Sequence, residues 1–355
     1  MVNSVALLYG GRSGEHDVSC ISAQFIEKNI LTAGYKVIPV YIDRHGEWHL
    51  QERVHTNPEK NIKRPVRLVP GDPPELVNEN ESVTFDFVFP IIHGTGGEDG
   101  TLQGLLDFFR IPYAGAGVLC SSLCMDKYFA RQMFNQHDLP QVQYTRISRS
   151  EWENDSNAVE DKISSNFAYP VFIKPCRMGS SVGVHKVAHE NEISKAIEEA
   201  LQYDDFLLCE EGKNVRELEI SILGNYPDYQ VSQIGEIEPN HNFYSYEAKY
   251  LDKDGASLTI PAQITEKEKQ QIQSMALKAF AATSGDGFAR IDFFMDKANG
   301  KILLNEINTL PGFTPVSMFP MLWLENGLDG PSLIQKIIDL GVQKFHNLSL
   351  LSVKR

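Results

Sequence analysis

The 355-residue sequence contains no apolar run that approaches the roughly 20 residues needed to cross a bilayer. Its apolar stretch near the N-terminus, residues 5–9, is short and has no basic segment before it, so we expect no secretory signal. Positive charge is also in deficit, with 33 Lys and Arg against 47 Asp and Glu and a net charge of -14. This balance argues against nucleic acid or an anionic membrane as a general partner.

Cysteine is scarce, and the five thiols are scattered along the chain at Cys20, Cys120, Cys124, Cys176 and Cys209. They lack the paired spacing of a structural zinc site, and the Cys120–Cys124 spacing alone is only a weak zinc signal. Small buried thiols are the better interpretation. We therefore expect a reducing compartment and a cytoplasmic protein.

Two common nucleotide-binding signatures are missing as well. The loop at residues 174–183 lacks the Gly-Lys-Ser/Thr ending of a P-loop, and residues 10–15 lack the dinucleotide pattern G-x-G-x-x-G. Glycine and serine in the 174–183 loop can still present backbone N–H groups and hydroxyls to phosphate, although a flexible turn is the alternative. Lys174, which ends the preceding apolar run, favours the phosphate site because it offers a point charge there.

The apolar pattern predicts a parallel sheet at the start of the chain. Strands at 5–9 and 36–42 flank a helix, which is a β-α-β unit, and residues 85–92 continue the sheet. Residues 55–82 are rich in Pro, Asn and charge and are expected to form a surface excursion without a core element.

The rest of the chain predicts a mixture of strands and helices. One or two helices are expected within 121–137, and a capping box at Thr265 and Glu268 precedes an amphipathic helix. Further strands are expected at 170–174, 184–187, 206–209 and from 217 onward, and further helices near 192–201 and 332–340. A chain of this length favours two or three domains.

The most informative segment is a predicted hairpin near the C-terminus. Side chains alternate along a strand, so Arg290 and Asp292 share one face, as do Glu306 and Asn308. Residues 297–300 are turn-rich, and pairing centred near residue 299 places Asp292 opposite Glu306. Carboxylate and amide oxygens together are ligands for hard divalent cations such as Mg²⁺.

Three further segments carry candidate residues whose role the pattern leaves open. Glu15 is either a favourable charge at a helix start or a partner for a substrate ammonium. His93, in a glycine-rich turn, is either a ligand contact or a turn residue. Residues 244–250 form either a loop that closes over a site or a surface strand with partly buried tyrosines.

Taken together, seven segments resemble the D-alanine–D-alanine ligase family of the ATP-grasp superfamily. They occur in family order and cover nearly the whole chain: residues 10–19, 93–104, 125–127, 174–183, 246–250, 290–292 and 305–315. The resemblance implies an ATP-grasp fold (α/β and α+β) with an N-terminal, Rossmann-like parallel-sheet domain. It also implies a substrate domain at 1–122, a central ATP-grasp subdomain at 123–212 and a C-terminal subdomain with metal site and lid at 213–355.

The resemblance implies roles in ATP binding for a first group of residues. Two Mg²⁺ or Mn²⁺ ions would be held by Asp292, Glu306 and Asn308. The nucleotide would be contacted by Lys127, Lys174 and Lys249 at the phosphates, by the backbone of a hinge with Glu210, Glu211 and Lys213 at the adenine, and by Glu217 at the ribose.

A second group would act on the amino-acid substrates. Glu15 would pair with the ammonium of the first D-alanine, with His93 nearby, and a chain of hydrogen bonds would join Glu15, Ser180 and Tyr250 to the lid. The remaining roles are an oxyanion site at Arg290 and the backbone of Gly312, and a carboxylate site for the second D-alanine at Ser317 and Met318.

The implied reaction is ATP-dependent synthesis of D-alanyl-D-alanine for peptidoglycan precursors, by a homodimer. Within the resemblance, Tyr250 favours an amine acceptor over D-lactate, so a D-alanine–D-lactate ligase is an alternative, as is an ATP-grasp ligase for another amino acid. A nucleotide-binding sensor without catalysis is a third alternative. The joint presence of Lys174, Arg290 and the three metal-site residues argues against the sensor.

Overall fold

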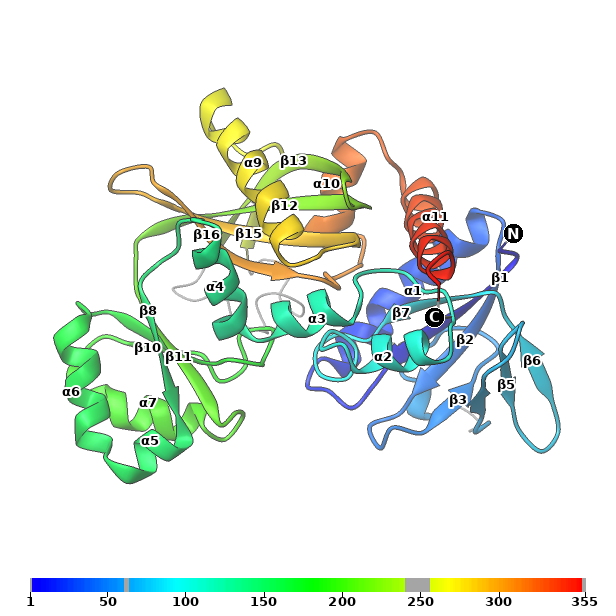
Figure 1. The fold of residues 1–355 in the computed structure, drawn as a ribbon, viewed down its shortest axis with the longest axis horizontal. Helices are drawn as coiled ribbons and strands as arrows, with labels where there is room; N and C mark the ends of the chain where they lie inside the picture. Colours follow the sequence, from blue (N-terminus) through cyan, green and yellow to red (C-terminus); the bar gives the residue numbers. More distant parts are fainter. Residues whose placement is uncertain (1, 61–63, 240–255, 353–355) are drawn as a thin grey trace.

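The computed structural model describes residues 2–60, 64–239 and 256–352. The chain has an N-terminal part (residues 2–117), a central part (residues 118–211) and a C-terminal part that follows them. Figure 1 shows the strands of the N-terminal part at one end of the molecule and those of the central part at the other, with a five-stranded sheet between them. A helix able to cross a bilayer is absent from these described ranges, where every helix is too short or too polar.

The N-terminal sheet has the order β3-β2-β1-β7, and β1 pairs in parallel with both β2 and β7. The predicted β-α-β start is thereby confirmed. Its strands are β1 (Ser4–Gly10), β2 (Lys36–Ile42), β3 (Trp48–Leu50) and β7 (Phe87–Ile91), and its helices are α1 (His16–Thr32) and α2 (Thr101–Phe108). The carboxyl ends of β1 and β7 lead into the two glycine-rich loops that carry Glu15 and His93.

The excursion at residues 55–82 is more ordered than the sequence predicts. It contains a short 3₁₀ helix (Pro58–Lys60) and the strands β4 (Arg67–Val69) and β5 (Glu75–Val77). These two strands form an antiparallel sheet with β6 (Ser82–Thr84), which begins at the end of the excursion. Leu76 is fully buried against the N-terminal core. The prediction of an excursion without a core element was wrong, because strands of three residues are too short to show a periodic pattern.

The last helix, α11 (Gly330–Ser349), packs on the first sheet. Four of its side chains join β1, α1 and β7 in one apolar cluster: Leu333, Ile334, Ile337 and Ile338. The helix can approach this closely because residue 341 is a glycine, which has no Cβ. A Cβ there would lie only 2.5 Å from the Tyr113 carbonyl oxygen. Nearby, the buried Lys344 donates to the Gly115 carbonyl at 2.7 Å and lies 3.9 Å from the centre of the Tyr113 ring.

We expect stability to rise with pH in alkaline solution because of Lys344. Burial lowers the pKa of this amine to about 8, so above that pH the unfolded chain binds a proton that the folded chain does not. The free energy of unfolding should therefore increase from pH 8 upward, by at most about 3 kcal/mol, until the unfolded amine also titrates. Denaturant unfolding of wild type and Lys344→Met across this range measures the effect, and an equal pH slope in both proteins would contradict it.

The central sheet is antiparallel, with the order β10-β9-β11-β8. Its strands are β8 (Tyr144–Ser148), β9 (Val171–Pro175), β10 (His185–Val187) and β11 (Phe206–Glu211). One face packs on α5 (Arg149–Asn154), α6 (Ser156–Asn166) and α7 (Ile193–Ala200), the last following a 3₁₀ turn (Glu190–Glu192). Phe172, Lys174, Leu208 and Glu210 share the other face by strand alternation.

Two helices, α3 (Val118–Met125) and α4 (Lys127–Gln136), connect the first and central sheets. The break between them is at Asp126, which has an extended backbone and accepts hydrogen bonds from the N–H groups of Tyr128 and Phe129 at 3.0 and 3.2 Å. Asp126 is therefore an N-cap, and this cap sets the start of the helix that carries Lys127.

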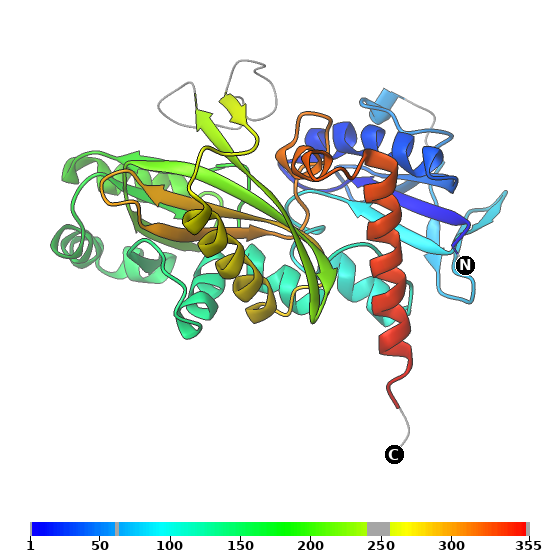
Figure 2. The same ribbon diagram turned by 90° about the horizontal axis from the view of Figure 1, so that it is seen from above.

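The five-stranded antiparallel sheet has the order β14-β13-β12-β15-β16. Its strands are β12 (Val215–Asn225), β13 (Asp228–Pro239), β14 (Ala256–Thr259), β15 (Gly287–Asp296) and β16 (Ile302–Asn308). α9 (Glu266–Ala282) lies along its apolar face (Figure 2), and α3 and α4 contribute to the same cluster. α10 (Met318–Glu325) follows the loop after β16.

The predicted capping box at the start of α9 is confirmed. Glu268 accepts from the Thr265 N–H at 2.7 Å, and Thr265 Oγ1 accepts from the Glu268 N–H at 3.3 Å. Thr265→Ala should destabilise the fold by about 1 kcal/mol, because an N–H group at the helix start loses its acceptor. Urea unfolding measures this loss, with Thr265→Ser as the control that keeps the acceptor. Full stability in the alanine variant would count against the cap.

Candidate active site

The C-terminal hairpin has the register that the sequence predicts. Asp292 lies opposite Glu306, and Arg290 lies opposite Asn308. The register shifts after Asp292, since Phe293 pairs with Leu304, so Asn305 is the extra residue of a β-bulge. Bulges redirect side chains locally, and this one falls immediately before Glu306.

A second carboxylate on the same face, Glu219, was not among the predicted site residues. It lies opposite Asp292 on β12, is 6% exposed, and its Oε2 is 2.9 Å from Arg290 Nε. Arg290 also donates to both oxygens of Asp292 at 2.7 Å. One guanidinium thus forms ion pairs with two carboxylates. The alternating run Glu217-Leu-Glu219-Ile-Ser could have revealed this face from the sequence, because the polar residues recur with period two.

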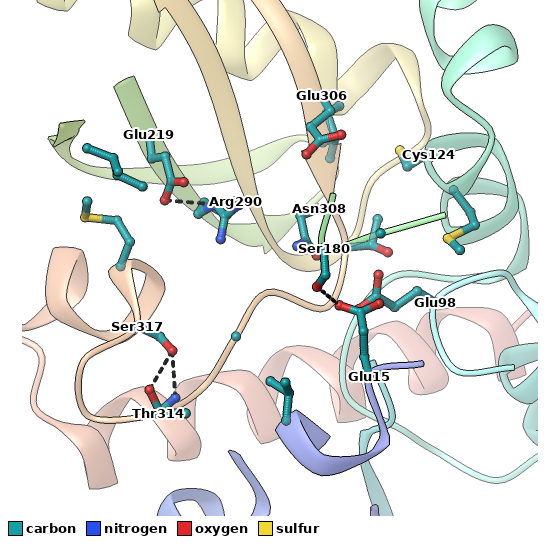
Figure 3. A pocket seen from close by; sticks show the side chains of 18 of the residues that line it. Glu15, Glu98, Cys124, Ser180, Glu219, Arg290, Glu306, Asn308, Thr314 and Ser317 are labelled. Carbon is teal, nitrogen blue, oxygen red and sulfur yellow. Dashed lines mark hydrogen bonds and ion pairs between the residues drawn. The ribbon is translucent and has the colours of Figure 1, made fainter. Parts of the chain in front are cut away.

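Glu15 meets the predicted phosphate loop across 165 residues of sequence. Ser180 Oγ donates to its Oε1, and Figure 3 shows the two side chains pointing toward each other. A Cβ placed at Gly94 or Gly179 would lie 2.6 or 2.8 Å from Glu15 Oε2, so both glycines make room for this carboxylate. Ser180 has a φ of 49°, in the left-handed region that is unfavourable for residues other than glycine. Backbone strain of this kind is typical of functional loops.

A cavity of about 320 Å³ brings residues from all three parts of the chain together (Figure 3). The predicted residues that line it are Glu15, Lys127, Ser180, Arg290, Glu306, Asn308, Gly312, Ser317 and Met318. The lining also includes Glu98 and Glu219, which the sequence did not single out as site residues. The predicted residues that do not line it are His93, Lys174, Glu210, Glu211, Lys213, Glu217 and Asp292. Lys249 and Tyr250 lie outside the described residues.

Two predicted phosphate-binding lysines come from the central part: Lys127 lines the cavity, and Lys174 on β9 does not. Lys127 Nζ donates to the Met178 carbonyl at 2.7 Å and lies 3.7 Å from Glu306 Oε2. Lys174 Nζ lies 2.5 Å from Glu210 Oε2, and both side chains are nearly buried. Burial raises the pKa of Glu210, but Arg131 and Lys174 outweigh it and hold that pKa below its ordinary value. A carboxylate between two cations therefore stays charged.

His93 is buried and does not line the cavity, but it contacts Glu98, which does. Its Nε2 is 3.0 Å from Ser22 Oγ, and its Nδ1 is 3.0 Å from the Leu310 carbonyl and 3.4 Å from Glu98 Oε1. Burial lowers the pKa of this imidazole, but the hydrogen bond and the charge of Glu98 outweigh burial and raise it overall. The ring joins the β7 turn to the loop after β16, and it also orients Glu98.

The loop before α10 is held by its own side chains. Ser317 Oγ accepts from the Thr314 N–H at 3.0 Å and is 2.8 Å from Thr314 Oγ1. A Cβ at Gly312 would lie 3.1 Å from Ser317 Oγ, so this position is packed closely. Met318 is 4% exposed and packs with Ile237 in a small apolar cluster beside the cavity.

The adenine hinge residues predicted on β11 and after it lie apart from the cavity. Lys213 Nζ is 2.5 Å from Glu211 Oε1 and 4.0 Å from Asp296 Oδ2. Glu217 follows on β12, on the same face as Glu219 and opposite Phe294 on β15. These positions continue the polar sheet face away from the hairpin site.

Comparison with known proteins identifies the family of this chain. A family model described as D-ala D-ala ligase N-terminus matches residues 4–116, and one described as D-ala D-ala ligase C-terminus matches residues 133–339. A protein named D-alanine–D-alanine ligase from Heliobacterium modesticaldum is 43% identical, with 97% of this chain and 96% of that protein covered. One of the same name from Bacillus cytotoxicus is 42% identical, with 96% of each covered.

Solved structures agree with the sequence comparisons. The D-alanine-D-alanine ligase from Coxiella burnetii has a TM-score of 0.86 at 33% identity, with 98% of this chain and 95% of that one covered. The VanG D-Ala:D-Ser ligase from Enterococcus faecalis has a TM-score of 0.82 at 32% identity, with 96% and 100% covered. The expected ATP-grasp fold is confirmed. The chain belongs to the D-alanine–D-alanine ligase family.

Proposed function

We propose that this chain catalyses the ATP-dependent ligation of two D-alanines to D-alanyl-D-alanine, for peptidoglycan precursor synthesis, at the cavity described above. The observation that carries the proposal is convergence: Glu15 comes from the N-terminal part, Lys127 and Ser180 from the central part, and Arg290 and Glu306 from the hairpin. An ammonium partner, phosphate contacts and an oxyanion partner are the groups that such a ligation needs.

ATP would lie along the polar faces of the central and five-stranded sheets. Lys127, Lys174 and Lys249 would contact its phosphates, with the adenine at the hinge of Glu210, Glu211 and Lys213 and the ribose at Glu217. The contact of Lys127 with the Met178 carbonyl supports this placement, because it sets the lysine against the glycine-serine loop. Lysine beside backbone N–H groups is a common arrangement for phosphate binding.

Asp292, Glu306 and Asn308 fit two Mg²⁺ or Mn²⁺ ions, because each offers a hard oxygen and all three occupy neighbouring positions of one hairpin face. Bound there, a divalent ion would supply charge neutralisation for the ATP phosphates. Arg290 holds Asp292 in place from the adjacent position of β15.

The first chemical step would make the poorly electrophilic carboxylate reactive. A carboxylate oxygen of the first D-alanine attacks the γ-phosphorus, the bond from that phosphorus to the β–γ bridging oxygen breaks, and ADP leaves. Glu15 would orient this substrate through its ammonium, and Ser180 holds the Glu15 carboxylate. Lys127 and Lys174 would neutralise charge on the transferring phosphoryl group.

The second step would form the amide. The amine of the second D-alanine attacks the acyl carbon and loses a proton, the C–O bond to phosphate breaks, and phosphate leaves. Arg290 and the Gly312 N–H would stabilise the oxyanion of the tetrahedral intermediate. Ser317 and Met318 would receive the carboxylate of the acceptor, and the lid with Tyr250 would exclude water from the acyl phosphate.

The direct test is incubation of the protein with ATP, Mg²⁺ and D-alanine. We expect D-alanine-dependent release of phosphate together with dipeptide. Phosphate release that does not respond to D-alanine would refute the proposal, and binding of ATP without any turnover would favour the sensor alternative.

We expect D-alanine to be preferred over D-serine as the acceptor. Ile237, Leu258 and Met318 line the cavity and pack together, and these apolar side chains offer a side-chain hydroxyl no strong hydrogen-bond acceptor. D-lactate should be a poor acceptor because of Tyr250. Competition of the three acceptors near neutral pH, with separation of the products, measures both preferences, and a dominant D-Ala-D-Ser product would contradict the first.

We also propose a cytoplasmic homodimer with the domain limits 1–122, 123–212 and 213–355. Apolar side chains exposed on the neighbouring helices α2 and α3 support self-association: Leu105, Phe108, Val118 and Leu119. All five cysteines are buried and unpaired, as suits a reducing compartment. Sedimentation of the purified protein tests the dimer.

A further inference from the structure

Arg131, on α4, is the largest fully buried side chain among the described residues, with 2% of its surface exposed. The sequence did not single it out, because an arginine on a helix is usually solvated. Placing a guanidinium inside a protein is unfavourable unless charged partners compensate. The partners of Arg131 therefore indicate what it does.

Arg131 contacts both halves of the proposed nucleotide site. Its Nη2 forms an ion pair with Glu210 Oε1 on β11 and lies 3.4 Å from Asn305 Oδ1 on β16. The guanidinium also lies 5.4 Å from the centre of the Tyr144 ring, and Tyr144 is the cross-strand neighbour of Glu210. One side chain thus joins the central sheet to the five-stranded sheet.

Each of these contacts leads to a proposed ATP-site group. Glu210 is the ion-pair partner of Lys174, with 2.5 Å between Nζ and Oε2. Asn305 is the bulge residue immediately before Glu306. Arg131 also lies one helical turn after Lys127, whose Nζ is 3.7 Å from Glu306. The cations of α4 therefore border both the phosphate side and the metal side of the site.

We propose that Arg131 is a positioning residue for ATP: it shares the charge of Glu210 with Lys174, so that Lys174 keeps positive charge with which to bind phosphate. The row Arg131–Glu210–Lys174 carries a net charge of +1, whereas Glu210 and Lys174 alone would be neutral. Without Arg131, Lys174 would be the one cation still in an ion pair with Glu210 among the described residues, and Glu210 would compete with phosphate for it. The contact to Asn305 fixes this row relative to the strand that carries Glu306.

The inference rests on the proposed placement of ATP at Lys174 and Glu210. Within the described residues, Nε and Nη1 of Arg131 are buried and make no hydrogen bond. Two of its three nitrogens thus contribute charge and not hydrogen bonds. A lysine at this position should therefore restore much of the function, which would not hold if the forked guanidinium were needed for packing.

The test compares Arg131→Met with Arg131→Lys. We expect the methionine variant to raise KM for ATP by about tenfold or more, with KM for D-alanine nearly unchanged, and the lysine variant to recover most of this loss. An equal rise of both KM values without rescue by lysine would make Arg131 merely structural and overturn the inference.

A double-mutant cycle keeps the inference testable if Arg131→Met folds poorly. The variant Arg131→Met with Glu210→Gln leaves no unpaired carboxylate, and the glutamine amide oxygen remains a hydrogen-bond acceptor for the amine of Lys174, so the protein should fold. If Arg131 acts through Glu210, the effect of Arg131→Met on KM for ATP should largely vanish in the Glu210→Gln background. Additive effects of the two substitutions would overturn the inference.

Lys174→Met separates failure of the inference from failure of the ATP placement. We expect it to raise KM for ATP at least as much as Arg131→Met. If Lys174→Met left ATP kinetics unchanged, the placement of ATP would be wrong and the inference would fall with it. If Lys174→Met impaired ATP use and Arg131→Met did not, only the inference would fail.

Discussion

Glu306→Gln is expected to lower turnover by about 10²- to 10³-fold, which corresponds to the several kcal/mol of charge stabilisation that a metal ligand supplies. The substitution keeps the size of the side chain and removes one negative charge from the hairpin face. Its effect on folding should be small, because Glu306 is about one third exposed and its ion pair with Lys127 spans 3.7 Å. Steady-state kinetics across a range of Mg²⁺ concentrations, together with thermal unfolding, measures both quantities.

Glu236→Gln is the matched control on the same sheet. Glu236 is 5% exposed and accepts two hydrogen bonds of 2.6 Å from Arg216, but it does not line the cavity. We expect this variant to lose stability and keep its turnover, the reverse of Glu306→Gln. Parallel losses of stability and turnover in Glu306→Gln would mean that Glu306 is structural.

Arg290→Lys is expected to lower turnover by about 10²- to 10³-fold at saturating ATP and metal, because the oxyanion loses a directed donor. Lysine keeps the positive charge beside Glu219 and Asp292, so neither carboxylate is left without a cation. It cannot reproduce the fork that donates to both oxygens of Asp292. The readout is single-turnover formation of dipeptide.

Arg216→Lys controls for the general consequences of losing a forked arginine. Arg216 lies on β12 and binds both oxygens of Glu236, while its side chain points to the sheet face opposite the cavity. Both lysine variants should lose comparable stability, but only Arg290→Lys should lose turnover. If the two variants retained turnover equally well, Arg290 would have no part in the chemistry.

Features that depend on neighbouring residues in the chain were predictable. The register of the β15–β16 hairpin follows from period-two alternation and a turn-rich connection, so Asp292 could be placed opposite Glu306. The α9 cap follows from Thr265 and Glu268, which are three residues apart. In both cases the interacting groups are close in sequence, and geometry leaves few alternatives.

Contacts between distant segments were harder to predict from the sequence. The short strands β4, β5 and β6 and the packing of α11 on the first sheet gave no periodic signal that named their partners. The family resemblance suggested the contact between Glu15 and Ser180, but the residues around it did not. Glu219 and Arg131 went unnoticed because a buried charge and a solvated one look alike in a sequence.

By itself, the sequence determined the family, the parallel start of the fold and the polar face of the hairpin, because motif order and side-chain alternation are local properties. Only the tertiary structure decided which charges from distant segments share a site. Ion pairs such as Arg131 with Glu210 and Arg290 with Glu219 form between segments about 80 and 70 residues apart, which chain folding alone brings within reach. Burial then gives those pairs their strength, since charges removed from water interact far more strongly than charges in it.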